Sequence, residues 1–386
     1  MKEILAVTWM SLRTIPARWG SSLVVVVGMA CAVGALVSIL SMSAGFLRTM
    51  ANTGSPSRAI IMSDGALGEW GSTIDHGEAT ILADMPGVAE DGAHKPIVSA
   101  EYFAYTIVSK KSDGQDTGVG VRGVSLEDPL LRPEVKLIDG RWFRPGTYEI
   151  VVGKGAQEQF EGLKVGDRIA LPSGDWLVTG TFQSNGGANE SELITDASTL
   201  LSAMRSSAYK SMTVRLSSPA AFTQFKNAIT SRPGPALQID RESDYYAEQS
   251  KSFDQYLRTI AYVVGGIMGL GATFGALNTM YSAIAARARE IATLRAIGFG
   301  GAAVMISVIS ETLLFCLIGA GLGVGFAWAL FNGYQHAMAG LVIRLAVTPA
   351  LALTGIGFAL ALGAIGGLFP AARAARMPIV DALRAV

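Results

Sequence analysis

The side chains that most often perform catalysis are few and widely separated in this sequence. The three histidines are His76, His94 and His336, and the only two cysteines, Cys31 and Cys316, fall within long apolar stretches. Metal sites and nucleophilic triads need several such groups in a recognisable pattern, and neither a G-x-S-x-G nor a G-x-x-x-x-G-K-[ST] motif occurs. We therefore expect no catalytic, metal-binding or cofactor-binding residues in this chain.

Glu311 is the one carboxylate within a long apolar stretch. An ionisable group inside a membrane is costly and usually has a partner or a function. Two interpretations are open. We favour a structural one, in which Glu311 reaches the membrane surface or bonds a neighbouring helix, and the other is a role in proton coupling.

A segment near residue 290 combines charged and apolar side chains at helical spacing. Arg287 and Glu290 share one face of a helix, whereas Ile291 and Leu294 share another. Such a helix suits docking into a groove on another protein, and a solvated loop would explain the arginines but not the apolar face. The residues that we expect to make this contact are Arg287, Arg289, Glu290, Ile291, Leu294, Arg295 and Gly298.

Four long apolar stretches must position these residues. Half of the chain is hydrophobic and only 16% is charged, against about 25% charged residues in a typical soluble protein. Each stretch exceeds the roughly 20 residues that cross a bilayer. We expect a membrane α-helical protein with four transmembrane helices and a large α+β extracytoplasmic domain inserted between helices 1 and 2.

The expected boundaries divide the chain into nine segments. They are an amphipathic cytoplasmic segment 1–18, helix 1 at 19–47, the α+β domain 48–256, helix 2 at 257–286, a cytoplasmic coupling helix 287–303, helix 3 at 304–332, a short external loop 333–348, helix 4 at 349–372 and a cytoplasmic tail 373–386.

Charge predicts the orientation. Basic residues cluster in the N-terminal segment, the coupling segment and the tail, whereas residues 48–258 carry 21 basic and 27 acidic groups, a net charge of −6. Because basic residues favour the cytoplasmic side, we expect both termini inside and the large domain outside.

The α+β domain alternates short β-branched runs with helical patterns. The expected strands are 59–62, 102–108, 118–123, 149–152, 168–171, 176–182, 212–216 and 237–239, and the expected helices are 76–84, 154–160, 197–204 and 220–229. Residues 242–264 contain neither Gly nor Pro, which predicts one helix from this domain into the second span. Gly45 and Gly54 predict a softer junction with the first span.

Small residues recur at four-residue spacing within the spans, which allows helix backbones to approach closely. Gly265 with Gly269 and Gly319 with Gly323 are such pairs. We assign these four glycines, together with Glu311, to packing of the membrane helices.

Three segments together resemble the FtsX-like permeases. Residues 287–298 resemble the family segment R-x-R-E-I-x-x-L-R-A-x-G, Glu311 matches a family glutamate, and Pro370, Arg373 and Arg376 lie in a similar C-terminal motif. Residues 140–143, 149–153 and 164–167 resemble turns and strands of the MacB-like periplasmic domain. MacB itself carries a fused ATPase, which this sequence does not match.

The resemblance implies an ABC transporter permease in a bacterial inner membrane. It implies a separate cytoplasmic ABC ATPase that binds ATP and Mg²⁺, and a homodimer or a heterodimer with a similar permease. A periplasmic adaptor, or membrane fusion protein, with an outer-membrane channel, or lipid and lipoprotein handling, would fit the family, and membrane lipids but no nucleic acid are expected partners. Two alternatives stay open, which are a membrane-anchored extracytoplasmic sensor and a regulator of a cell-wall hydrolase.

Overall fold

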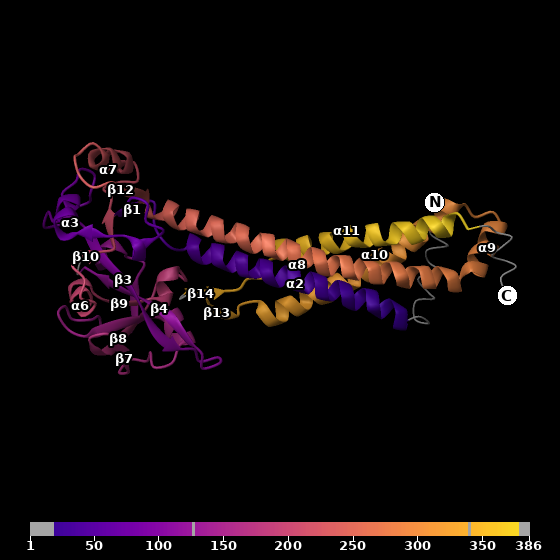
Figure 1. Cartoon of the computed structure of the whole chain (residues 1–386), viewed down its shortest axis with the longest axis horizontal. Coiled ribbons are helices and arrows are strands. Elements are labelled where there is room, and N and C mark those ends of the chain that lie inside the picture. Colours follow the sequence, from indigo (N-terminus) through magenta and orange to yellow (C-terminus); the bar gives the residue numbers. More distant parts are fainter. Residues whose placement is uncertain (1–18, 126–127, 339–340, 378–386) are drawn as a thin grey trace. The chain divides into compact units, whose positions relative to one another are not determined.

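The computed structural model describes residues 19–125, 128–338 and 341–377, which form two compact units (Figure 1). We call them the α/β unit, with residues 45–253 and 335–344, and the helical unit, with the remaining described residues. The amphipathic segment predicted over residues 1–18 lies outside the described residues, as does the end of the predicted tail.

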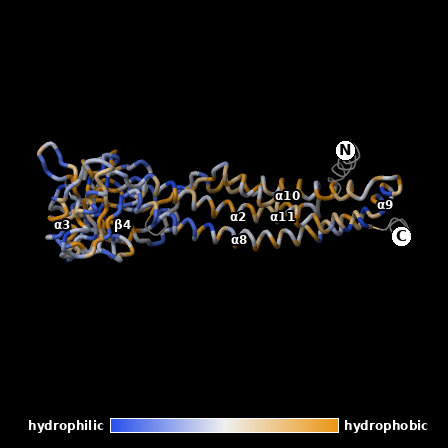
Figure 2. Tube along the Cα trace, turned by 90° about the horizontal axis from the view of Figure 1, so that it is seen from above, coloured by the Kyte–Doolittle hydropathy of each residue, from blue (hydrophilic) through white to orange (hydrophobic). Residues whose placement is uncertain are grey.

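Within the described residues, four helices are long and apolar enough to cross a membrane. They are α2 (Trp19–Ala51), α8 (Glu242–Ala286), α10 (Gly301–Phe331) and α11 (Pro349–Ala375), and hydrophobic colouring predominates along them in Figure 2. The first turn of α11 combines a proline with a cap, since the Thr348 hydroxyl accepts a bond from Leu351 N. These helices, with the α/β domain in the sequence between α2 and α8, confirm the predicted fold class.

Glycines let α10 approach α2 within the helical unit. A Cβ atom on Gly323 would lie 2.5 Å from the Ala30 carbonyl oxygen, and one on Gly319 would lie 2.6 Å from that of Val26. This pair therefore forms a close contact within the chain. The other predicted pair lies against side chains, with Leu36 of α2 beside Gly265 and Leu362 of α11 beside Gly269.

The α/β unit is built on one large mixed sheet. In spatial order its path is β12 (Leu237–Arg241), β1 (Arg58–Ser63), β11 (Ser211–Arg215), β3 (Val98–Ser109), β4 (Asp116–Val124), β9 (Leu193–Asp196), β6 (Glu149–Gly153), β8 (Gly174–Gln183) and β5 (Lys136–Gly140), with β7 (Arg168–Leu171) paired to β8. Two pairs, β4 with β9 and β6 with β8, are parallel. A short separate pair joins β2 (Ile74–Asp75) to β10 (Ala208–Tyr209).

Both faces of this sheet bury side chains, because successive residues of a strand point to opposite sides. One face is apolar and packs beneath α3 (His76–Ala83), α5 (Lys154–Gln159), α6 (Ala197–Ala203) and α7 (Ala221–Thr230). The other face also buries apolar side chains, such as Ile60 and Ile194. In addition it carries a row of buried charged residues, among them Arg58 on β1, Glu101 on β3 and Arg122 on β4.

Every strand and helix predicted between residues 59 and 239 is present, with shifts at the ends. The prediction missed the edge strand β5, the short strands β2, β9 and β10, and the short helices α4 (Asp128–Leu131), η2 (Glu69–Gly71) and η3 (Ala188–Ser191). The missed elements are short, so they leave little periodic signal.

The segment between α10 and α11 differs from the predicted loop 333–348. It holds a hairpin of β13 (Gln335–Met338) and β14 (Leu341–Arg344), which belongs to the α/β unit. Ile343 is 1% exposed within an apolar cluster that includes Phe46 and Tyr246, and Val342 N donates to the Ser191 hydroxyl. The hairpin therefore packs as part of the α/β core, which its sequence did not indicate.

The helix predicted from residue 242 onward is confirmed, since α8 runs without a break from Glu242 to Ala286. The soft junction predicted at Gly45 is wrong. Gly45 lies inside α2, and a Cβ atom there would lie 2.4 Å from the Arg344 carbonyl oxygen. This glycine serves close packing against the hairpin rather than flexibility.

Candidate functional site

The segment predicted to dock a partner forms a short helix, α9 (Ala288–Ala296), between α8 and α10. Arg287, with φ −103° and ψ 9°, separates it from α8. Gly298 has φ +111°, a conformation that side chains other than glycine rarely adopt, and it ends α9. The predicted coupling helix 287–303 is therefore shorter than expected, because α10 begins at Gly301.

One side of α9 packs on the helical unit itself. Ile291 is 8% exposed in an apolar cluster with Ile284 of α8, Val308 of α10 and Ala374 of α11. We had expected Ile291 to contact another protein, and the structure gives it an internal contact instead. Leu294 is half-buried. The apolar face of this helix therefore anchors α9 to its own chain.

A buried ion pair holds the turn between α8 and α9. Arg287 Nη1 lies 3.3 Å from Glu311 Oε2 on α10, and both side chains are at most 10% exposed. This pairing offsets the cost of placing a carboxylate in an apolar helix, and it fits the structural interpretation of Glu311. The sequence assigns Arg287 to partner docking and Glu311 to packing of the membrane helices, and the structure brings the two side chains together.

The C-terminal motif lies beside α9 and α8. Arg295 Nη1 donates to the Met377 carbonyl oxygen at 2.5 Å, just past the end of α11. The Arg373 guanidinium lies 5.5 Å from the centre of the Tyr281 ring, a distance at which a cation and an aromatic ring attract each other. Pro370 is buried within α11, and Arg376 is its C-cap. The two sequence motifs therefore meet in one place.

The other side of α9 is exposed. It presents the charged residues Arg289 and Glu290, and beyond them Thr293 and Ala296. Ile297 is 72% exposed, and we did not single it out from the sequence. An isoleucine directly before the glycine that ends the predicted helix is the sequence signal that could have identified it.

The exposed side of α9 can bind a partner through its charged and apolar side chains. Among the described residues, no group of three His, Cys, Asp or Glu side chains is placed to hold a metal ion. The site instead offers a small charged and apolar surface, fixed from behind by an ion pair and an apolar cluster.

Two family models match the chain. The MacB-like periplasmic core domain matches residues 22–232, and the FtsX-like permease C-terminal model matches residues 262–379.

Curated relatives resemble parts of the chain. The macrolide export ATP-binding/permease protein MacB 1 of Yersinia pestis bv. Antiqua (strain Antiqua) is 28% identical over 198 residues, which are 47% of this chain and 28% of that protein. The MacB of Psychrobacter cryohalolentis is 24% identical over 257 residues, 61% of this chain and 37% of that protein. The chain thus spans well under half the length of these two relatives.

A solved structure of the periplasmic region of MacB from Actinobacillus actinomycetemcomitans is also similar. It is 15% identical, with a TM-score of 0.38, and covers 53% of this chain and 97% of that structure.

Proposed function

Because the chain belongs to the FtsX-like ABC transporter permeases with a MacB-like periplasmic core domain, we propose that it transmits ATP-driven movement from a cytoplasmic ATPase to its α/β unit. The ATPase would bind ATP and Mg²⁺. The chain itself would supply a docking surface, a lever and a moving domain.

The exposed side of α9 is the docking surface in this proposal. Ile297 would enter an apolar pocket of the ATPase, since buried apolar anchors carry much of the energy of protein contacts. Glu290, in the first turn of α9, would meet a basic group. The Arg287–Glu311 pair and the buried Ile291 would keep α9 fixed to the helical unit, so that a push on α9 moves the helices behind it.

The observation that carries the proposal is the continuity of α8. Its 45 residues contain no break, and an α-helix of this length is about 67 Å long. The helix starts directly after β12, a strand of the sheet, and ends one residue before α9. A single helix that begins at the sheet and ends at the docking surface can carry movement between them.

The setting is also proposed. We place the chain in a bacterial inner membrane, with the α/β unit in the periplasm, and we infer that two identical or similar permeases pair around two ATPase subunits. The relatives are named for macrolide export, so we propose export with an envelope adaptor and an outer-membrane channel, and a macrolide as the first cargo to test.

The test is reconstitution in lipid nanodiscs with an ABC ATPase subunit from the same organism. We expect the permease to bind the ATPase and to change its rate of ATP hydrolysis. Glu290→Lys should lose this effect because it reverses a charge in the contact, whereas Arg344→Ala, in the hairpin, should not. A parent chain that neither binds the ATPase nor alters hydrolysis would contradict the proposal and favour the sensor alternative.

A further inference from the structure

The first residue of α8 is held by a buried clamp. Glu242 is 1% exposed, and its Oε2 accepts hydrogen bonds from Arg58 Nε at 2.5 Å and from the Ser55 backbone N at 3.0 Å. Its Oε1 lies 3.6 Å from Arg132 Nη2. Arg58 belongs to β1, Ser55 follows α2, and Arg132 follows α4. One carboxylate thus joins three separate segments to the start of the helix.

The clamp adds a constraint that the sheet alone does not supply. The strand β12 ends at Arg241 and pairs with β1, so the ladder fixes where α8 starts. A ladder does not fix the direction of a helix that follows it, because the backbone can turn at the junction. The contacts of Glu242 with two guanidinium groups lie in the first turn of α8, where they set that direction.

The clamp continues into the middle of the sheet. Arg132 Nη1 lies 2.8 Å from Glu101 Oε1 on β3, and Glu101 Oε2 accepts a bond from Arg122 of β4 at 2.7 Å. Arg122 in turn is bound by Glu69 and Glu192. Apart from Glu134, described below, the side chains of this network are at most 9% exposed. Buried ion pairs add little net stability, so stability alone does not account for so many.

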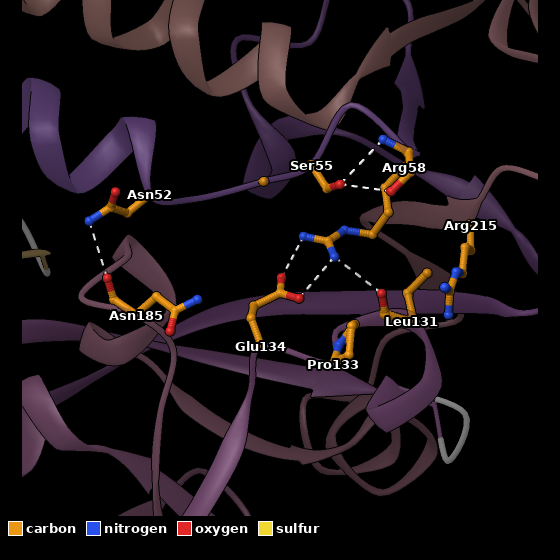
Figure 3. Close-up of a pocket in the computed structure, with 10 residues that line it drawn as sticks. Asn52, Ser55, Arg58, Leu131, Pro133, Glu134, Asn185 and Arg215 are labelled. Atoms are coloured by element: carbon orange, nitrogen blue, oxygen red, sulfur yellow. Dashed lines mark hydrogen bonds and ion pairs between the residues drawn. The ribbon is translucent and has the colours of Figure 1, made fainter. Parts of the chain in front are cut away.

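Arg58 also binds a second carboxylate group, which can be compared with that of Glu242. Glu134 accepts bonds from both terminal nitrogens of Arg58, but it lies in the segment after α4, and its side chain is 21% exposed against 2% for Glu242. Figure 3 shows Glu134 and Arg58 at a pocket of about 250 Å³, which Asn52, Asn185 and Arg215 also line. Arg58 thus has one carboxylate partner open to solvent and one partner on the helix.

We propose that Glu242 is a positioning residue. Its contacts with Arg58 and Arg132 set the direction in which α8 leaves the sheet, so that a movement of α8 also moves the α/β unit. The inference rests on the proposed function, because α8 is the lever there. Its geometric part, the fixed direction of α8, holds without an ATPase and can be measured without one.

The experiment measures the angle of α8 through a distance between two spin labels in the full chain. The labels are attached at Glu248→Cys on α8 and at Thr230→Cys at the end of α7, both exposed, with Cys31 and Cys316 replaced by alanine. Distances are recorded in nanodiscs, first without nucleotide and then with the ATPase and ATP. Glu242→Gln is compared with Glu134→Gln, which removes a carboxylate from the same Arg58 but not from α8.

We expect a narrow distance distribution in the parent and in Glu134→Gln, unchanged by ATP. Glu242→Gln should broaden it without nucleotide and shift it with ATP. Arg132→Gln should also broaden the distance distribution. If Glu242→Gln does not fold, the distribution in Arg132→Gln tests the inference in its place. A residue that only stabilises the fold would lower the unfolding midpoint but leave the native distribution narrow.

Two results would overturn the inference: a narrow distribution in Glu242→Gln, or equal broadening in Glu134→Gln. Failure of the proposed function looks different. The parent would then not bind or influence the ATPase, while the effect of Glu242→Gln without nucleotide would still be present.

Discussion

The two ends of α8 are fixed in different ways. At Glu242 the helix starts within a network of charged groups, whose bonds require defined directions. At the other end, Arg287 pairs with Glu311 beside an apolar cluster around Ile291, and apolar contacts have no preferred direction. The difference indicates that several directed bonds hold the Glu242 end of α8, whereas burial together with an ion pair holds the Arg287 end.

The largest effect that we expect comes from breaking the pair at the Arg287 end. Glu311→Gln removes the negative charge that pairs with the buried guanidinium of Arg287, which should cost about 3 to 5 kcal/mol of unfolding free energy. The measurement is unfolding in detergent by increasing denaturant. The double variant Arg287→Glu with Glu311→Arg should recover part of the loss, and a Glu311→Gln protein as stable as the parent would show that the pair does not hold this end.

The connection between the two ends can be broken separately. Gln255→Pro removes one helical hydrogen bond from an exposed position of α8 and should cost about 3 kcal/mol of local helix stability. We expect ATPase binding to persist, while nucleotide-dependent changes in hydrogen exchange disappear from the α/β unit. Gln255→Ala is the control and should behave like the parent. If the proline variant still shows those changes, an unbroken α8 is not required.

Helix packing behind α8 should give an intermediate effect. A Cβ atom in Gly323→Ala would lie 2.5 Å from the Ala30 carbonyl oxygen, so α2 and α10 must separate, at a cost of about 1 to 3 kcal/mol. Gly321→Ala is the matched control, because nothing lies within 4 Å of the added atom. The measurement is the thermal unfolding midpoint of both variants in detergent. Equal midpoints for Gly323→Ala and Gly321→Ala would mean that α2 and α10 are not tightly packed at Gly323.

Acid should weaken the α/β unit through its paired carboxylates. Burial alone would raise the pKa of Glu101, but Arg132 and Arg122 lower it below its ordinary value, and a bond from Arg141 lowers the pKa of Glu149. A carboxyl group with a lowered pKa stabilises the fold above its unfolded pKa of about 4.3, and this stability is lost as the pH falls through the folded value.

We therefore expect unfolding of the α/β unit to become easier below about pH 4. Hydrogen exchange of the full chain in nanodiscs, measured peptide by peptide, separates the two units. In Glu149→Gln, unfolding of the α/β unit should depend less on pH than in the parent. Unfolding of the α/β unit that does not vary between neutral pH and pH 3 would contradict this expectation.

Periodicity and charge in the sequence were enough to predict the four long helices and most of the sheet, because their signals are local. The apolar runs exceed the thickness of a bilayer, and strands such as β6 and β8 are rich in β-branched and aromatic or aliphatic residues. The edge strand β5 was missed because its side chains are largely exposed and do not alternate clearly between apolar and polar.

The misses at the candidate site have another cause. The apolar face of α9 was predictable, but helical spacing does not say whether such a face meets another protein or its own chain, and Ile291 packs inward. The pairing of Arg287 with Glu311 and the clamp on Glu242 join residues between 24 and 187 positions apart. Contacts of that kind depend on the packed structure and leave no pattern in the sequence around either residue.

The central claim is that the exposed side of α9 docks an ATPase while its buried side holds the helical unit. The most direct measurement places a photo-crosslinking amino acid at Ile297, which is 72% exposed, or at Ile291, which is 8% exposed. The probe is illuminated in membranes that contain the ABC ATPase subunit used in the reconstitution. The account predicts an ATPase adduct from position 297 and only internal crosslinks from position 291. An ATPase adduct from position 291 with none from position 297 would contradict it.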